Sequence, residues 1–77
     1  MAVVGKDRQI QKRLGERVRM LRKEKDFSQE GFADACGLHR TYMGSIERGE
    51  TNPTLTSLAI ISRTLKITLS KLLEEVD

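Results

Sequence analysis

Side chains that can hydrogen-bond nucleic-acid bases stand close together between residues 40 and 45. The guanidinium fork of Arg40 matches O6 and N7 of guanine, a contact worth about 1–3 kcal/mol of discrimination between bases. Thr41 offers a hydroxyl group, or its methyl group to a thymine, and Ser45 follows it by one helical turn. We therefore predict base contacts from Arg40, Thr41 and Ser45; the alternative for Arg40 is a solvated surface arginine.

A second group of residues is suited to the phosphates of a DNA backbone. Gln29 falls in the first turn of an expected helix, where unpaired backbone N–H groups favour an anion. Tyr42 carries a hydroxyl donor, and Arg48 and Asn52 follow the base-contacting segment. The alternatives are packing of Tyr42 against a neighbouring helix, and solvation or local capping for Arg48 and Asn52.

Two expected helices joined by a glycine carry these residues. Ser28 is a favourable N-cap, and Phe32, Ala33 and Cys36 form an apolar stripe at helical spacing. Gly37 then permits the left-handed turn that ends this first helix. The sequence therefore predicts a helix over residues 28–36.

The following helix begins near His39, which could cap it, and its apolar residues are Met43 and Ile46. Gly49 ends it. Two short helices joined by a tight glycine turn form a helix-turn-helix, which makes the second helix project where it can enter a DNA major groove.

Three further helices are expected around this pair. Apolar residues at helical spacing predict an amphipathic helix over residues 7–25, preceded by a flexible arm over residues 1–6. Gly15 lies inside this helix at a cost of about 1 kcal/mol, which suggests close approach by another helix. Pro53 interrupts the chain before a fourth helix, which Thr54 caps and which extends to residue 65.

A break near residues 66–67 precedes the last expected helix, which Thr68 caps and which continues through Val76. With no strand-like alternation and no repeat, the chain is predicted to be all-α, with five helices in a single domain over residues 1–77. Leu69, Leu72, Leu73 and Val76 exceed what so small a core needs. We expect residues 67–77 to form a dimer interface through these four residues; the alternative is that they only close the core of one chain.

The positive charge is concentrated at the amino-terminal end. Residues 1–27 hold nine Lys or Arg and four acidic residues, whereas residues 28–77 hold five and seven. Such a basic helix strengthens salt-dependent binding to phosphates, and a solvated face is the alternative.

Composition makes several classes of protein improbable. One cysteine forms no internal disulfide, and no paired Cys/His pattern indicates a metal site. No segment resembles a membrane span, a signal peptide or a glycine-rich phosphate loop, so we expect a cytoplasmic protein without cofactor or small-molecule ligand. An enzyme is disfavoured because the chain has one histidine, no plausible triad and little room for a substrate pocket.

The chain resembles the Cro/repressor family of helix-turn-helix regulators, with a lambda-repressor-like domain, over residues 14–73. The residues that carry the resemblance are Gln29, Ala33, Gly37, the run IERG at 46–49, Pro53, Leu58 and Leu65. The segment LHRTYMGSIERGETNPTLTSL, residues 38–58, is most similar to controller proteins of restriction–modification systems. Gly31, Gly44 and Ser45 depart from the family pattern, because they are small at positions where larger side chains are usual.

The resemblance implies roles for particular residues and partners. Gln29 would anchor the DNA backbone, and Glu47 would pair with Arg22 to brace the third helix against the first. Controllers are small homodimers that bind paired operators and regulate their own gene and the endonuclease gene.

Several alternatives stay open at this point. A phage-type repressor or an antitoxin-like autoregulator shares the same scaffold, and a protein-interaction module is the alternative outside DNA binding. Glu30 and Asp34 lie four residues apart on the exposed side of their helix. They would form an ordinary solvated face or, in an activator, a contact with RNA polymerase.

Overall fold

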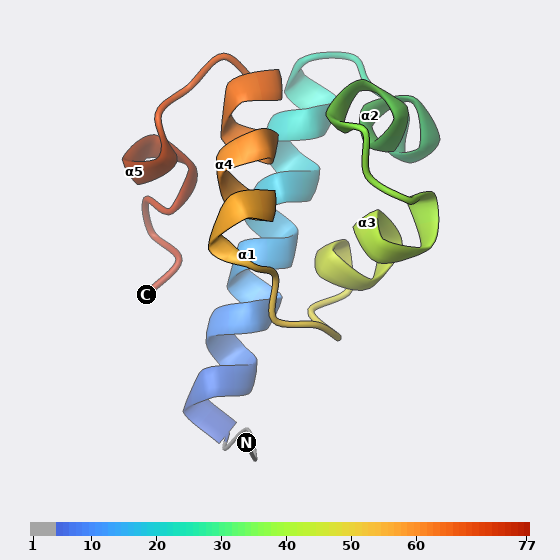
Figure 1. Cartoon of the computed structure of the whole chain (residues 1–77). Helices are drawn as coiled ribbons and strands as arrows, with labels where there is room; N and C mark the ends of the chain where they lie inside the picture. Colours follow the sequence, from blue (N-terminus) through green and yellow to red (C-terminus); the bar gives the residue numbers. More distant parts are fainter. Residues whose placement is uncertain (1–4) are drawn as a thin grey trace.

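The structure is a computed structural model that describes residues 5–77, and these residues form five helices without a strand. Figure 1 shows α1 running through the length of the molecule, with α2 and α3 on one side, α5 on the other and α4 across α1 between them. The all-α, five-helix prediction is confirmed. The helices are α1 (Gly5–Glu24), α2 (Gln29–Cys36), α3 (Arg40–Glu47), α4 (Leu55–Thr64) and α5 (Leu69–Leu72).

Both ends of the helical region differ from the sequence-based expectation. α1 begins at Gly5, so residues 5 and 6 of the expected arm are helical, and residues 1–4 lie outside the described part. α5 ends at Leu72 instead of continuing through Val76. The chain turns at Glu75, which has a φ of 66°, and the turn returns Val76 to the core with 6% exposure. Burial of Val76 explains why the helix stops early.

Local caps explain where the other helices begin and end. The hydroxyl groups of Ser28, Thr54 and Thr68 accept hydrogen bonds from backbone N–H groups in the first turns of α2, α4 and α5. Each bond satisfies one of the amide donors that a helix start leaves unpaired. Gly37 ends α2 with a φ of 70°, a left-handed conformation that glycine adopts without steric cost. The predicted caps and the predicted glycine turn are confirmed.

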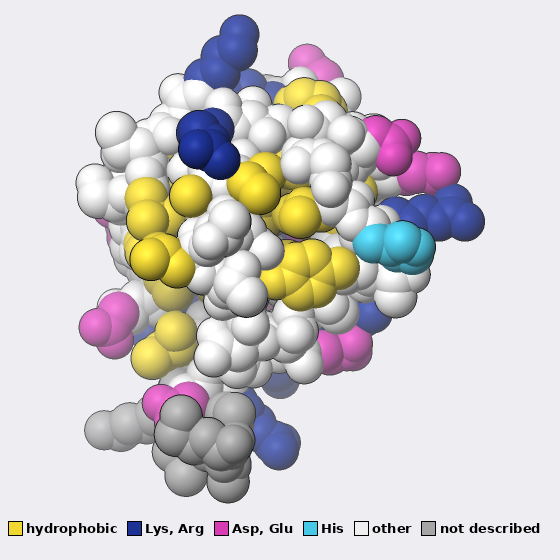
Figure 2. Space-filling model, viewed as in Figure 1, with side chains coloured by type: hydrophobic (Ala, Val, Ile, Leu, Met, Phe, Trp, Pro, Cys, Tyr) yellow, Lys and Arg dark blue, Asp and Glu magenta, His cyan; other side chains and the backbone are white. Residues whose placement is uncertain are grey.

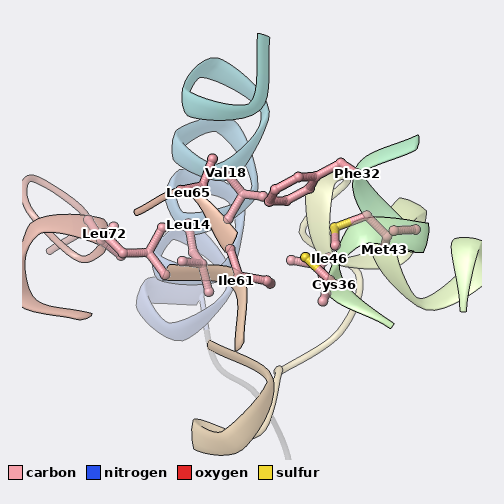
Figure 3. Packing of buried hydrophobic residues seen from close by; sticks show 11 residues of the cluster. Leu14, Val18, Phe32, Cys36, Met43, Ile46, Ile61, Leu65 and Leu72 are labelled. Carbon is pink, nitrogen blue, oxygen red and sulfur yellow. The ribbon is translucent and has the colours of Figure 1, made fainter. Parts of the chain in front are cut away.

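The hydrophobic core joins all five helices. Figure 3 shows Phe32, Cys36, Met43 and Ile46 gathered between α2 and α3, whereas Leu72 points from α5 toward α1 and α4. Phe32, Met43, Ile46 and Leu72 are each 1% exposed or less. Helices of eight residues or fewer are marginal alone, so packing against this core must hold α2, α3 and α5 in place.

Gly15 explains how α3 comes close to α1. A Cβ atom at Gly15 would lie 2.5 Å from the carbonyl oxygens of both Ile46 and Glu47, at the end of α3. No real side chain fits there, so the predicted close approach is confirmed. In residues 5–77, no helix is both long enough and apolar enough to cross a bilayer.

Candidate nucleic-acid interface

The first turn of α3 presents its polar side chains to solvent. The Nδ1 atom of His39 accepts a hydrogen bond from the backbone N–H of Thr41 at 3.1 Å, which caps the helix. Arg40 and Thr41 are both exposed. Figure 1 shows α3 at the edge of the bundle next to α2, so its first turn projects away from the body. Base contacts were predicted for Arg40, Thr41 and Ser45, and of these three residues Arg40 and Thr41 have exposed side chains.

Arg40 is paired within the chain. Its Nη1 atom lies 3.0 Å from Oε1 of Glu30 on α2, and both side chains are 67% exposed. An exposed ion pair of this kind contributes little free energy, so it holds the guanidinium near α2 and yields readily to a stronger partner.

Glu47 and Arg22 form the ion pair that the family resemblance implied. Arg22 donates from Nε to Oε2 of Glu47 at 2.7 Å and from Nη2 to Oε1 at 2.9 Å. Its Nη1 atom also donates to the carbonyl oxygen of Phe27 at 2.8 Å. The pair is buried, with side-chain exposures of 8% and 3%. Two parallel hydrogen bonds fix direction as well as distance, so α3 is oriented relative to α1.

Gln29 extends this network to α2. Its Nε2 atom donates to Oε1 of Glu47 at 3.2 Å. The side chain passes over Gly44, where an added Cβ would lie 3.3 Å from Oε1 of Gln29 and 3.0 Å from Nη1 of Arg48. The missing side chain at Gly44 therefore leaves space for both neighbours. This explains the small residue that departs from the family pattern in the middle of α3.

Tyr42 and Ser45 use their hydroxyl groups inside the protein. The hydroxyl of Tyr42 donates to Oγ of Ser57 at 3.1 Å and accepts from the backbone N–H of Thr54 at 3.3 Å. The expectation that this hydroxyl is available for a phosphate is therefore corrected, because packing against α4 engages it. Ser45 donates to the carbonyl oxygen of Tyr42 at 2.8 Å and keeps only acceptor capacity for a ligand.

Arg48 and Asn52 lie after α3, where their side chains are exposed. Nε of Arg48 is 3.0 Å from Oε1 of Glu50, and both side chains are more than half exposed. Acidic residues thus pair with both Arg40 and Arg48, which was not predicted from the sequence. The spacing of two residues between Arg48 and Glu50 was an available signal, whereas the pairing of Glu30 with Arg40 required the angle between α2 and α3.

The four predicted dimer residues separate into two groups. Leu72 is fully buried and Val76 is 6% exposed within the single chain, so both belong to its own core. This corrects the expectation of a surplus apolar stripe. Leu69 is half-buried and Leu73 is 37% exposed, so these two still reach the surface.

Cys36 has a structural environment. It is a free, buried cysteine in the hydrophobic core. Desolvation by burial raises the pKa of its thiol, and this effect outweighs the hydrogen bond with Thr64, which lowers the pKa. The thiol stays protonated near neutral pH and is unreactive as a nucleophile. Within residues 5–77 no group of three metal-ligating side chains comes together.

A short capped helix that projects from a glycine turn, with a buried ion pair behind it, defines a helix-turn-helix DNA-binding domain. Comparisons with known proteins agree with this class. A family model described as helix-turn-helix matches residues 18–72. The control protein C.MunI from Mycoplasma is 48% identical over 69 residues, which cover 88% of this chain and 93% of that protein.

Two solved structures extend the comparison. The restriction-modification controller protein C.AhdI from Aeromonas hydrophila has a TM-score of 0.77 and 38% identity, covering 79% of this chain and 92% of that one. SinR, a master regulator for biofilm formation solved in complex with DNA, has a TM-score of 0.75 and 35% identity. That match covers 79% of this chain and 98% of the SinR chain. The chain belongs to the helix-turn-helix family of DNA-binding transcriptional regulators.

Proposed function

We propose that this regulator is the controller protein of a restriction–modification system and regulates its own gene and the endonuclease gene. Its likeness to C.MunI and C.AhdI supports this assignment over other regulators with the same scaffold. Arg40 and Thr41 read bases in the major groove, and Ser45 adds an acceptor one turn later. The carrying observation is the exposure of Arg40 and Thr41 in the capped first turn of α3.

Backbone contacts come from both sides of α3 in this proposal. Gln29 approaches one phosphate from the start of α2, and Arg48 and Asn52 approach another from the turn after α3. Tyr42 positions α3 against α4 through the hydrogen bonds of its hydroxyl group with Ser57 and Thr54. Arg22 and Glu47 brace the helix without touching DNA.

The regulator is proposed to act in the cytoplasm as a homodimer on inverted-repeat operators. Figure 2 shows hydrophobic side chains in patches on the face that carries α4 and α5. Leu55, the first residue of α4, is 69% exposed, and Leu73, which follows α5, is 37% exposed. With Leu69 they replace the buried Leu72 and Val76 in the proposed interface.

Selection of bound duplexes from random DNA tests the function and yields the half-site together with its spacing. We expect an inverted repeat in which one conserved guanine per half-site disappears when Arg40 is changed to Ala. That variant should lose about 1–3 kcal/mol of discrimination at this position. Because Arg40 is exposed and weakly paired, the free energy of unfolding should remain unchanged.

Other outcomes would favour different assignments. Absence of DNA binding at low salt would favour a protein-interaction module. A selected operator upstream of a toxin gene would favour an antitoxin-like autoregulator, and one in a prophage would favour a phage-type repressor. Contact with RNA polymerase through Glu30 and Asp34 would be detected as activation that is lost when both are changed to alanine while operator binding persists.

A further inference from the structure

A basic cleft lies between the amino-terminal part of α1 and the turn that follows α3; we refer to it as the α1–α3 cleft. Three cationic side chains surround it, together with one carboxylate and one amide. Its lining residues are Arg8, Gln11, Lys12, Arg48, Gly49 and Glu50. Arg8, Gln11 and Lys12 are spaced so that they share one face of α1.

The two sides of the cleft are fixed relative to each other. Gly49 adopts a φ of 72°, and a Cβ atom placed on it would lie 2.8 Å from the Cα atom of Lys12. Only a residue without a side chain permits this contact between the turn and α1. Lys12 is therefore held beside the turn that carries Arg48.

The charges in the cleft favour an anion. Arg8, Lys12 and Arg48 outnumber the single carboxylate of Glu50, and all four side chains are exposed. Glu50 occupies Arg48 through an ion pair of 3.0 Å that is open to solvent. Exposed pairs of this type are weak, so an entering phosphate could take the place of Glu50 at Arg48.

The cleft lies beyond the base-contacting part of the helix-turn-helix. Figure 1 shows the first turns of α1 projecting past the rest of the bundle, on the side where the chain leaves α3. Arg8 and Lys12 also precede residues 18–72, which the helix-turn-helix family model matches. The cationic side chains of α1 thus extend the surface on which Arg48 lies.

We propose that the α1–α3 cleft binds a backbone phosphate of DNA that flanks the bases contacted by α3. Arg8 and Lys12 hold this phosphate together with Arg48, and they lengthen the contact with the duplex without reading its sequence. The inference rests on the proposed function, because it requires that α3 dock on DNA.

The test compares two double variants that each remove two positive charges. The first variant, Arg8→Gln with Lys12→Gln, alters the cleft. The control, Arg63→Gln with Lys66→Gln, alters two exposed residues at and just after the carboxyl-terminal end of α4, outside the cleft. Affinity for the selected operator is measured by fluorescence anisotropy across a range of salt concentrations. The cleft variant should bind at least about tenfold more weakly near 0.1 M salt, and its salt slope should fall by about 1 per protomer, as expected for the loss of one phosphate contact. The control should match the wild type.

Ethylation interference then locates the contact. Ethylating a phosphate removes its charge, so the wild type should show interference at phosphates outside the bases protected by α3. The cleft variant should lose that flanking signal while keeping the signals within the half-site. Circular dichroism and thermal unfolding verify that both double variants are folded.

A gain-of-binding variant guards against loss through misfolding. Glu50→Gln removes the carboxylate that competes for Arg48, so affinity should rise severalfold and the salt slope should steepen. Glu74→Gln is the matched control, because this carboxylate also lies in an exposed ion pair but follows α5 and does not line the cleft.

Particular results would overturn the inference. Equal losses in both double variants would indicate a general charge effect, and an unchanged interference pattern in the cleft variant would place the phosphate elsewhere. Saturable binding of inorganic phosphate by the free protein, with DNA affinity unaffected by the cleft variant, would assign the cleft to a free anion. Failure of the wild type to bind any selected DNA would instead contradict the proposed function.

Discussion

Glu47 is the residue on which the orientation of α3 depends. Its two carboxylate oxygens accept three hydrogen bonds, two from Arg22 on α1 and one from Gln29 on α2. Arg22 in turn holds the carbonyl oxygen of Phe27, in the connection between those helices. A single buried carboxylate therefore links three helices, and its removal leaves a guanidinium buried without its charge partner.

Changing Glu47 to Ala should lower the free energy of unfolding by about 3 kcal/mol, because an uncompensated buried charge is costly. Glu47→Gln should cost less, since the amide oxygen still accepts a hydrogen bond from Arg22. Urea denaturation measures both. Operator affinity should fall in each variant under conditions where it is folded, because α3 loses its brace.

Glu74→Ala provides the control for that comparison. Its ion pair with Lys71 is more than half exposed on both sides, so its loss should change stability by less than about 1 kcal/mol. A Glu47→Ala variant as stable as this control, with full DNA affinity, would contradict the bracing role.

At the scale of the elements, local signals predicted most of the fold. Ser28, Thr54 and Thr68 cap helices through contacts within three residues, so their sequence neighbourhood contains the information. The length of α5 depends instead on where Val76 packs, which is a tertiary contact. The same limit applies to the site, since the hydrogen bonds of Tyr42 reach α4 and could not be read from nearby residues.

Gly15 and Gly44 show two different uses of a glycine inside a helix. At Gly15 an added Cβ meets backbone carbonyl oxygens of α3, which cannot move without shifting that helix. At Gly44 it meets the far ends of the Gln29 and Arg48 side chains, which can rotate away. The first glycine sets the packing of helices, whereas the second leaves room for side chains proposed to contact DNA.

Alanine at each glycine should separate these uses, because both changes gain about 1 kcal/mol of helix propensity. Overpacking costs about 1–3 kcal/mol, so Gly15→Ala should be destabilised by a net amount of up to about 2 kcal/mol. Gly44→Ala should be as stable as the wild type or more so, yet bind operator DNA more weakly as Gln29 and Arg48 are displaced. Thermal unfolding and anisotropy measure the two effects. Equal stabilities would show that α3 can shift away from α1.

At the scale of the whole molecule, one α3 contacts too few base pairs for selectivity in a genome. A second copy related by a two-fold axis would double the contact and place two α3 helices about 34 Å apart on one face of DNA. Because Leu72 and Val76 are buried in the core of one chain, the pairing surface that we propose instead includes the exposed Leu55 and Leu73 of the α4–α5 face.

Leu55→Glu should therefore shift the protein from dimer to monomer in analytical ultracentrifugation without unfolding it. Leu55 is the first residue of α4, where a negative charge is favourable at a helix amino terminus. Met20→Glu is the control, since Met20 is 45% exposed on α1. A control that dissociates while Leu55→Glu remains dimeric would place the interface on α1.

The wild type and the Leu55→Glu variant should also respond differently to the spacing between the two half-sites of the operator. Inserting about 5 base pairs between half-sites rotates one by half a helical turn, so the wild-type dimer should lose most of its affinity in a gel-shift titration. Inserting about 10 base pairs returns the two half-sites to the same face of the duplex but separates them by one more helical turn. Two α3 helices held at a fixed distance by the proposed α4–α5 interface cannot reach both half-sites at that separation. Leu55→Glu should bind all three operators weakly and alike, because monomers do not sense spacing. A wild type indifferent to the half-turn insertion would show that the two α3 helices are not held in register.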